Sequence, residues 1–271
     1  MPEEGSADPG HAADQAPPKN VGNWRAEEGS ENMEIGPGIR RIGADSIINS
    51  YLVEDGGEVT IVDAGLSGLW RDLPAELAAM GRTLDDVSAI VLTHGHSDHI
   101  GFAERGRRER GWPVWVHELD AALARGEVPN PAKRSAMRLG PILGFALWSM
   151  RHGIRIHHLA AVATYGDGAT LDVPGSPRVT LVPGHTPGSA ALHFTRHDAL
   201  LVGDALCTYA VTTGNRGPQI APFSADPELA LANLTRIENI SARFVLPGHG
   251  PAWEEGPAEA VRAARSAAAA R

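Results

Sequence analysis

Residues 93–99, Thr93-His94-Gly95-His96-Ser97-Asp98-His99, hold three imidazoles and a carboxylate within six positions, directly after the apolar run 87–92. These groups are the donors that borderline divalent metal ions accept. In an extended segment side chains alternate with period two, so His94 and His96 point the same way and can bind one ion together. Asp98 and His99 follow where the chain bends toward a helix, and they can face a second position. The segment therefore predicts a metal site after a buried strand, with Gly95 letting the backbone pass close to it.

Three further polar side chains follow short apolar runs later in the chain. His185 lies in the segment PGHTPG (183–188), Asp204 ends the segment LVGD (201–204), and His249 lies in the segment PGHG (247–250). Alone, each is typical of a structural loop residue or a helix cap. In combination with residues 93–99 they indicate one site built from several strand ends.

The order of these segments resembles that of the metallo-β-lactamase superfamily. His-x-His-x-Asp-His is followed by Gly-His-Thr-Pro-Gly, Gly-Asp and Pro-Gly-His-Gly, and the earlier segment VTIVDAG (59–65) resembles the first motif of the family, with Asp63 at a strand end. The resemblance covers about residues 39–255. It implies an α/β (α+β) fold, a four-layer αββα sandwich in which two mixed sheets pack face to face with helices outside.

The resemblance further implies a dinuclear metal centre with two ligand sets. His94, His96 and His185 would bind the first ion, Asp98, His99 and His249 the second, Asp204 would bridge them, and Asp63 would orient the loop or a ligand histidine. Seven side chains are also too many for one tetrahedral ion, which favours two ions independently. The histidine-rich set favours two zinc ions per chain, and iron or manganese stays open.

Two cations lower the pKa of a shared water, so the expected reaction is hydrolysis by a metal-bridging hydroxide, with Asp98 orienting the nucleophile. A carboxylate at position 204 resembles the thioesterase, lactonase and phosphodiesterase branches, whereas β-lactamases of the family generally have Cys or Ser there. We therefore expect cleavage of a thioester, lactone or phosphodiester, with β-lactamase activity at most minor or promiscuous. The alternative from another class is a mononuclear iron oxidoreductase resembling persulfide dioxygenases.

The segment of about residues 131–158 is expected to be a basic helical insertion that faces the substrate. It carries Lys133, Arg134, Arg138, Arg151 and Arg155 and no acid, with large apolar residues between them. As a helix pair, broken near residues 140–141, it would form an amphipathic lid. Phe145, Trp148 and Arg138 are candidate substrate contacts, as is Tyr209, which follows Asp204 at a spacing unlike that of the family's lactonases. The other interpretations are a packed helix with a solvated basic face and, third, a membrane-surface element.

Composition limits the remaining classes. The 271 residues carry a formal charge of −9 and one Cys, which excludes an internal disulfide framework. Residues 1–34 hold eight acids and two bases, so the acidity is concentrated in a predicted flexible tail, residues 1–32, ahead of a hydrolase domain, residues 33–271. We expect a small-molecule substrate, no nucleic acid, no stable membrane insertion and a cytoplasmic location, because no signal peptide or bilayer-spanning run is visible. A homodimer stays open.

The apolar patterning also predicts the regular elements. Strands are expected at 47–53, 59–62, 87–92, 114–116, 179–182, 190–194, 200–202 and 244–246, and helices at 69–80, 118–125, 131–152, 227–239 and 259–270.

Overall fold

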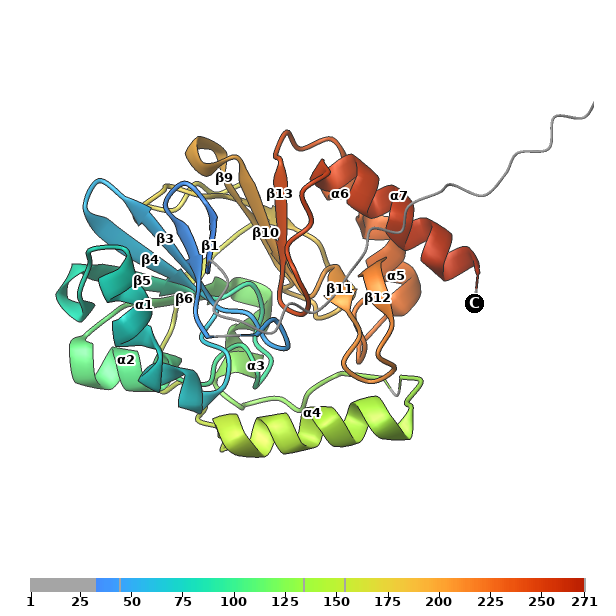
Figure 1. Cartoon of the computed structure of the whole chain (residues 1–271), viewed down its shortest axis with the longest axis horizontal. Coiled ribbons are helices and arrows are strands. Elements are labelled where there is room, and N and C mark those ends of the chain that lie inside the picture. Colours follow the sequence, from blue (N-terminus) through green and yellow to red (C-terminus); the bar gives the residue numbers. More distant parts are fainter. Residues whose placement is uncertain (1–32, 44, 134, 154, 271) are drawn as a thin grey trace, which may run out of the picture. The chain divides into compact units, whose positions relative to one another are not determined.

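A computed structural model describes residues 33–43, 45–133, 135–153 and 155–270. The predicted tail, residues 1–32, and Arg134 lie outside the described residues. Two main sheets run through the described chain, with helices on their outer faces (Figure 1). Within the described residues no helix is both long enough and apolar enough to cross a bilayer.

The first sheet has seven strands in sequence order, antiparallel from β1 to β4 and parallel from β4 to β7. Its strands are β1 (Glu34–Gly36), β2 (Ile39–Arg41), β3 (Tyr51–Asp55), β4 (Glu58–Val62), β5 (Val87–Val91), β6 (Val114–His117) and β7 (Ala163–Tyr165). The Gly56-Gly57 pair joins β3 to β4, and both glycines have positive φ, as a tight hairpin turn requires.

The second sheet has the order β13-β10-β9-β8, in which β10 and β13 are parallel and the other pairs antiparallel. Its strands are β8 (Arg178–Leu181), β9 (Ala190–Phe194), β10 (Ala199–Gly203) and β13 (Phe244–Pro247). A separate hairpin consists of β11 (Cys207–Tyr209) and β12 (Arg216–Gln219). Both main sheets are therefore mixed, as predicted.

Helices cover both sheets. The α-helices are α1 (Leu73–Ala79), α2 (Ala103–Arg110), α3 (Ala121–Ala124), α4 (Leu139–His152), α5 (Pro227–Asn233), α6 (Thr235–Glu238) and α7 (Gly256–Ala269). The 3-10 turns are η1 (Ser67–Arg71), η2 (Leu84–Asp86), η3 (Glu118–Asp120) and η4 (Thr195–His197).

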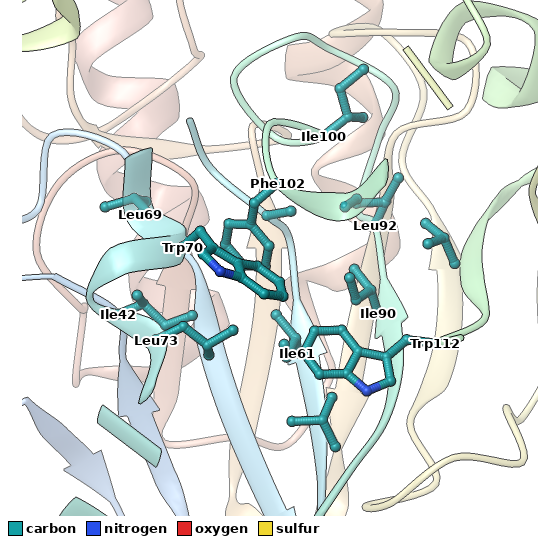
Figure 2. Close-up of a cluster of buried hydrophobic side chains, with 14 of the residues drawn as sticks. Ile42, Ile61, Leu69, Trp70, Leu73, Ile90, Leu92, Ile100, Phe102 and Trp112 are labelled. Atoms are coloured by element: carbon teal, nitrogen blue, oxygen red, sulfur yellow. The ribbon is translucent and has the colours of Figure 1, made fainter. Parts of the chain in front are cut away.

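Three apolar clusters separate four layers, because alternate residues of a strand face opposite sides of its sheet. Ile61 of β4 faces the outer cluster with α1 and α2, whereas Val62 faces the cluster between the sheets. The outer cluster includes Trp70, whose ring centroid lies 5.9 Å from that of Phe102 (Figure 2). A third cluster joins the second sheet to α6 and α7 through Ile237 and Val261. The αββα sandwich expected from the sequence is confirmed.

Some elements differ from those expected. The helix predicted over 69–80 is a 3-10 turn followed by α1, which begins at Leu73 with Pro74 in its first turn. The helix pair predicted in the basic insertion is a single helix, α4, because Gly140 and Pro141 lie in its first turn, where proline is tolerated. Helix α2 and strands β1, β2, β7, β11 and β12 were not expected from the apolar pattern.

The topology brings the polar segments together. β4, β5 and β6 are parallel, so the residues after them lie at one edge of the first sheet, and Asp63 and residues 93–99 follow β4 and β5 there. β10 and β13 are parallel in the second sheet, and Asp204 and His249 follow them.

Candidate metal centre

The structure brings together all seven side chains expected as ligands. Their donor atoms form three overlapping groups, and within each group all donor atoms lie within 4.8 Å of one another. The groups are His94, His96 and His185; His94, His99 and Asp204; and Asp98, His99 and His249. Six of the seven side chains are buried, and Asp98 is partly exposed.

The Asp204 carboxylate lies between the histidines. Its Oδ2 atom is 3.3 Å from Nε2 of His185 and 3.2 Å from Nε2 of His249, and its Oδ1 atom is 3.6 Å from Nε2 of His99. Gly248 makes this approach feasible, because a Cβ at that position would lie 2.3 Å from Oδ1 of Asp204.

Hydrogen bonds fix which ring nitrogen of each histidine faces the centre. Nδ1 of His99 donates to Asp63 at 2.9 Å, and Nδ1 of His249 donates to the carbonyl of Ile47 at 2.6 Å. Nδ1 of His185 lies 3.1 Å from Oγ of Ser224, whose own proton goes to a backbone carbonyl, so this ring nitrogen is the donor. In all three, Nε2 is left to face the centre.

His94 and His96 turn different ring nitrogens toward the centre. Nδ1 of His94 lies 3.1 Å from Oγ1 of Thr93, which itself donates to Asp63, so Nε2 of His94 faces the centre. Nε2 of His96 lies 3.0 Å from Oδ1 of Asn130, which also accepts from a backbone amide, so here Nδ1 faces the centre. Each imidazole thus turns one ring nitrogen toward the centre.

These inward atoms fit a cation. Nε2 of His94, Nε2 of His99 and Oδ1 of Asp204 are buried without a hydrogen-bond partner among the described residues. Nδ1 of His96 and Nε2 of His185 face each other at 2.9 Å, and two facing lone pairs repel unless a proton or a cation joins them. A buried polar atom without a partner is costly, and metal coordination would satisfy these atoms.

Burial and neighbouring charge divide the histidines into two kinds. Burial lowers the pKa of His94 and His96, and lowers that of His185 to about 3. Burial acts the same way on His99 and His249, but nearby carboxylates outweigh it, raising the pKa of His99 to about 9 and that of His249 well above its usual value.

The two carboxyl groups remain ionised. Burial acts to raise the pKa of both Asp98 and Asp204, but contacts with His249 and the other imidazoles hold each pKa well below its usual range. Without a metal ion, protons on His99 and His249 therefore balance the carboxylates, and a bound cation would displace those protons.

Asp63 is not one of the seven expected ligands, but it accepts several hydrogen bonds beside them. It is 2% exposed and accepts from the Thr93 amide at 2.7 Å, the Thr93 hydroxyl at 2.8 Å and Nδ1 of His99. Its φ of 58° is in the left-handed region, which non-glycine residues rarely adopt. Such strain is typical of a residue that the site requires.

Asp120 is a site residue that the sequence did not reveal. Its buried carboxylate accepts from the Gly95 amide at 2.8 Å, the Thr186 hydroxyl at 2.7 Å and the Gly188 amide at 2.7 Å. It therefore joins the histidine-rich loop to the loop that carries His185. An acidic residue shortly after a strand is typical of the start of a helix, so nothing in the sequence distinguishes Asp120 as a site residue.

A cavity of about 330 Å³ opens beside the centre. Asp98, His96, His185, Asp204 and His249 line it on the side of the centre. Its other walls are mainly apolar and include Leu66, Phe145, Ile156, Val211 and Phe223, with Asn130 and Arg155 among its polar residues. This volume is within the range of small-molecule sites.

One of the four expected substrate contacts lines the cavity, and the other three do not. Phe145 lines the cavity, whereas Trp148, Arg138 and Tyr209 are not among its lining residues. The indole of Trp148 donates to Asp45 at 2.6 Å, and the Tyr209 ring packs under the guanidinium of Arg216. The backbone amide of Arg138 donates to Thr212 at 2.8 Å.

Residues 43–249 match the family model described as the metallo-beta-lactamase superfamily. The chain belongs to this superfamily. It is 27% identical over 203 residues to the probable metallo-hydrolase YybB of Bacillus subtilis (strain 168), covering 75% of this chain and 80% of that protein.

A hydroxyacylglutathione hydrolase of Anaeromyxobacter dehalogenans (strain 2CP-C) is 31% identical over 167 residues, which is 62% of this chain and 48% of that protein. Among solved structures, TTHA1623 in a di-iron-bound form aligns with a TM-score of 0.56 and 27% identity, over 80% of this chain and 93% of that one. The family, its metallo-hydrolase relatives and the His/Asp cluster identify this chain as a metal-dependent hydrolase with a divalent metal cofactor.

Proposed function

We propose that this chain is a dinuclear zinc hydrolase that cleaves an ester-like bond in a small molecule. The observation that carries the proposal is the position of Asp204, whose carboxylate lies within 3.6 Å of inward nitrogens of His185, His249 and His99. His94, His96 and His185 would hold one ion, and Asp98, His99 and His249 the other, with Asp204 shared. Two bound cations would supply Lewis acidity, lowering the pKa of a water and polarising the bond to be cleaved.

Asp98 would orient the attacking water. Its carboxylate lines the cavity, is 27% exposed and lies 3.4 Å from Nε2 of His249, so it reaches both the centre and the substrate space. Its pKa is well below the usual range because the contacts with His249 and neighbouring imidazoles outweigh burial, so it accepts hydrogen bonds throughout the neutral range. An ionised carboxylate at the cavity wall favours a water turned with its oxygen toward the electrophile.

The cavity favours a substrate with an apolar part. Leu66, Phe145 and Phe223 give it apolar walls, and Arg155 is a lone guanidinium among the lining residues. An acyl thioester or lactone carries an apolar chain beside the reactive carbonyl and suits this lining. The name of the hydroxyacylglutathione hydrolase relative supports testing thioesters first.

The test is a hydrolysis screen of the zinc-loaded chain against thioesters, lactones, phosphodiesters and β-lactams. The proposal predicts turnover of at least one of the first three classes, faster than that of any β-lactam, and its loss after chelation. Zinc and iron are compared by loading the stripped chain with each metal, since TTHA1623 is described as di-iron-bound. If the chain instead binds one iron ion and consumes oxygen when given a thiol or persulfide substrate, it is an iron-dependent oxygenase.

A further inference from the structure

The outward face of α4 carries an apolar stripe exposed to solvent. Leu139, Leu143, Leu147 and Met150 are 82%, 55%, 59% and 68% exposed. At 3.6 residues per turn these side chains, with Ala146, cover an arc of about 100°. Of the nine large apolar side chains exposed in the described chain, six lie between Met137 and Ile156. Single exposed apolar residues are ordinary, but a gathered stripe indicates a partner.

The opposite face of α4 is already occupied. The Trp148 indole donates to Asp45, and a guanidinium nitrogen of Arg71 lies 3.4 Å from the carbonyl of Arg151. Phe145 and Ser149 line the cavity beside the metal centre. These contacts fix the rotation of the helix and leave the stripe exposed to solvent. Figure 1 shows α4 at the lower edge of the described residues.

Positively charged residues lie at or beyond both ends of α4. Lys133, Arg138, Arg151 and Arg155 are exposed, and none forms an ion pair with another described residue. No acid occurs from residue 128 to residue 166. On α2, by contrast, Arg105 pairs with Glu109 at 2.9 Å. The helix thus combines an exposed apolar stripe with nearby cations that pair with no anion among the described residues.

We propose that α4 docks this chain on an anionic lipid surface, lying in the interface with its stripe among the acyl chains and its cations at the headgroups. Its 14 residues span about 21 Å, too short to cross a bilayer but suited to lying along one. A second copy of the chain fits less well, because a symmetric contact through this face would bring the same cations together. Arg155 and Ile156 are both exposed and line the cavity, so docking would hold the cavity beside the lipid.

The proposal goes beyond hydrolysis and does not depend on which bond the site cleaves. It is tested by sedimenting the zinc-loaded full chain with vesicles of phosphatidylcholine, alone or with phosphatidylglycerol. We expect binding to the anionic vesicles that weakens with salt. The L143S/L147S variant has less apolar surface to bury among the acyl chains. Its partition coefficient onto the anionic vesicles should therefore be at least about 10-fold lower than that of the parent chain.

Matched controls separate the stripe from general surface changes. Leu119 and Leu229 are 54% and 45% exposed on other elements, so L119S/L229S should bind vesicles like the parent chain. Arg151→Glu should weaken binding to anionic vesicles, whereas Arg108→Glu on α2 should have little effect. Absence of vesicle binding, or binding unchanged in L143S/L147S, would overturn the proposal. So would a dimer in light scattering that L143S/L147S dissociates, because the stripe would then belong to a second copy.

Discussion

Nδ1 of His99 lies 2.9 Å from Oδ2 of Asp63, and the same carboxylate also holds both the amide and the hydroxyl of Thr93. One buried acid at the end of β4 therefore fixes a ring orientation at one end of the histidine-rich loop and the backbone at the other. These hydrogen bonds support the loop without using the inward donor atoms of the ligand set.

Replacing Asp63 tests this support. In Asp63→Asn the amide nitrogen would replace either Oδ1, which accepts from the Thr93 amide, or Oδ2, which accepts from the Thr93 hydroxyl and the His99 N–H, so at least one donor loses its acceptor. Metal affinity should fall about 10- to 100-fold, as for other partners of ligand histidines. Competition with a chromophoric chelator measures it. Asp172→Asn, at an exposed position, is the control, and equal affinities in the two variants would contradict the role given to Asp63.

Asp120 should matter for stability as well as for the site. Asp120→Asn removes a charged acceptor shared by Gly95, Thr186 and Gly188, in a fully buried position. We expect the free energy of unfolding to fall by about 2–4 kcal/mol, because hydrogen bonds to charged groups are strong and their loss leaves buried donors unpaired. Urea unfolding of the parent and variant measures the change. A loss below about 0.5 kcal/mol, the usual effect of a surface substitution, would show that the loops do not depend on this carboxylate.

Asn130 should act on one ion more than on the other. It accepts from Nε2 of His96 at 3.0 Å and so presents Nδ1 of that ring to the centre. Asn130→Ala should lower the affinity for the ion held by His94, His96 and His185 about 10-fold and leave the affinity for the second ion nearly unchanged. Stepwise metal titration resolves the two. Asn130→Asp keeps the acceptor and should restore the first step, and failure of this rescue would point to packing instead.

The metal-free protein should lose stability as pH rises. Nearby carboxylates raise the pKa of His99 to about 9 in the folded chain, against about 6.5 for an unperturbed histidine. A raised folded pKa contributes stability that is fully present below the unfolded pKa and is lost as pH rises through the folded pKa. Thermal unfolding of the chelated chain should show a falling Tm between about pH 7 and pH 9. Zinc loading should reduce this dependence, and a Tm that rises over the same window would exclude the effect.

The grouping of the seven expected ligands was predictable from the sequence because their imidazoles and carboxylates are concentrated in short segments. Imidazoles and carboxylates placed after apolar runs indicate strand-end loops, and the αββα fold brings those loops to one place. The roles of Asp120 and Asn130 could not be predicted, since their partners are backbone amides and a ring nitrogen in other segments. Which face of α4 packs against the protein could not be predicted either. Both of its faces are apolar, so periodicity alone could not show that Trp148 binds Asp45 while Leu147 faces solvent.

Counting the metal ions bound to Asp204→Ala and to the parent chain tests whether Asp204 joins two metal ions in one hydrolytic centre. Mass spectrometry of the dialysed proteins gives zinc per chain, and the same samples give the hydrolysis rate. We expect two zinc ions in the parent chain, with both zinc content and turnover sharply reduced in the variant. Two tightly held ions and unchanged turnover in Asp204→Ala would show that Asp204 does not bridge the metals.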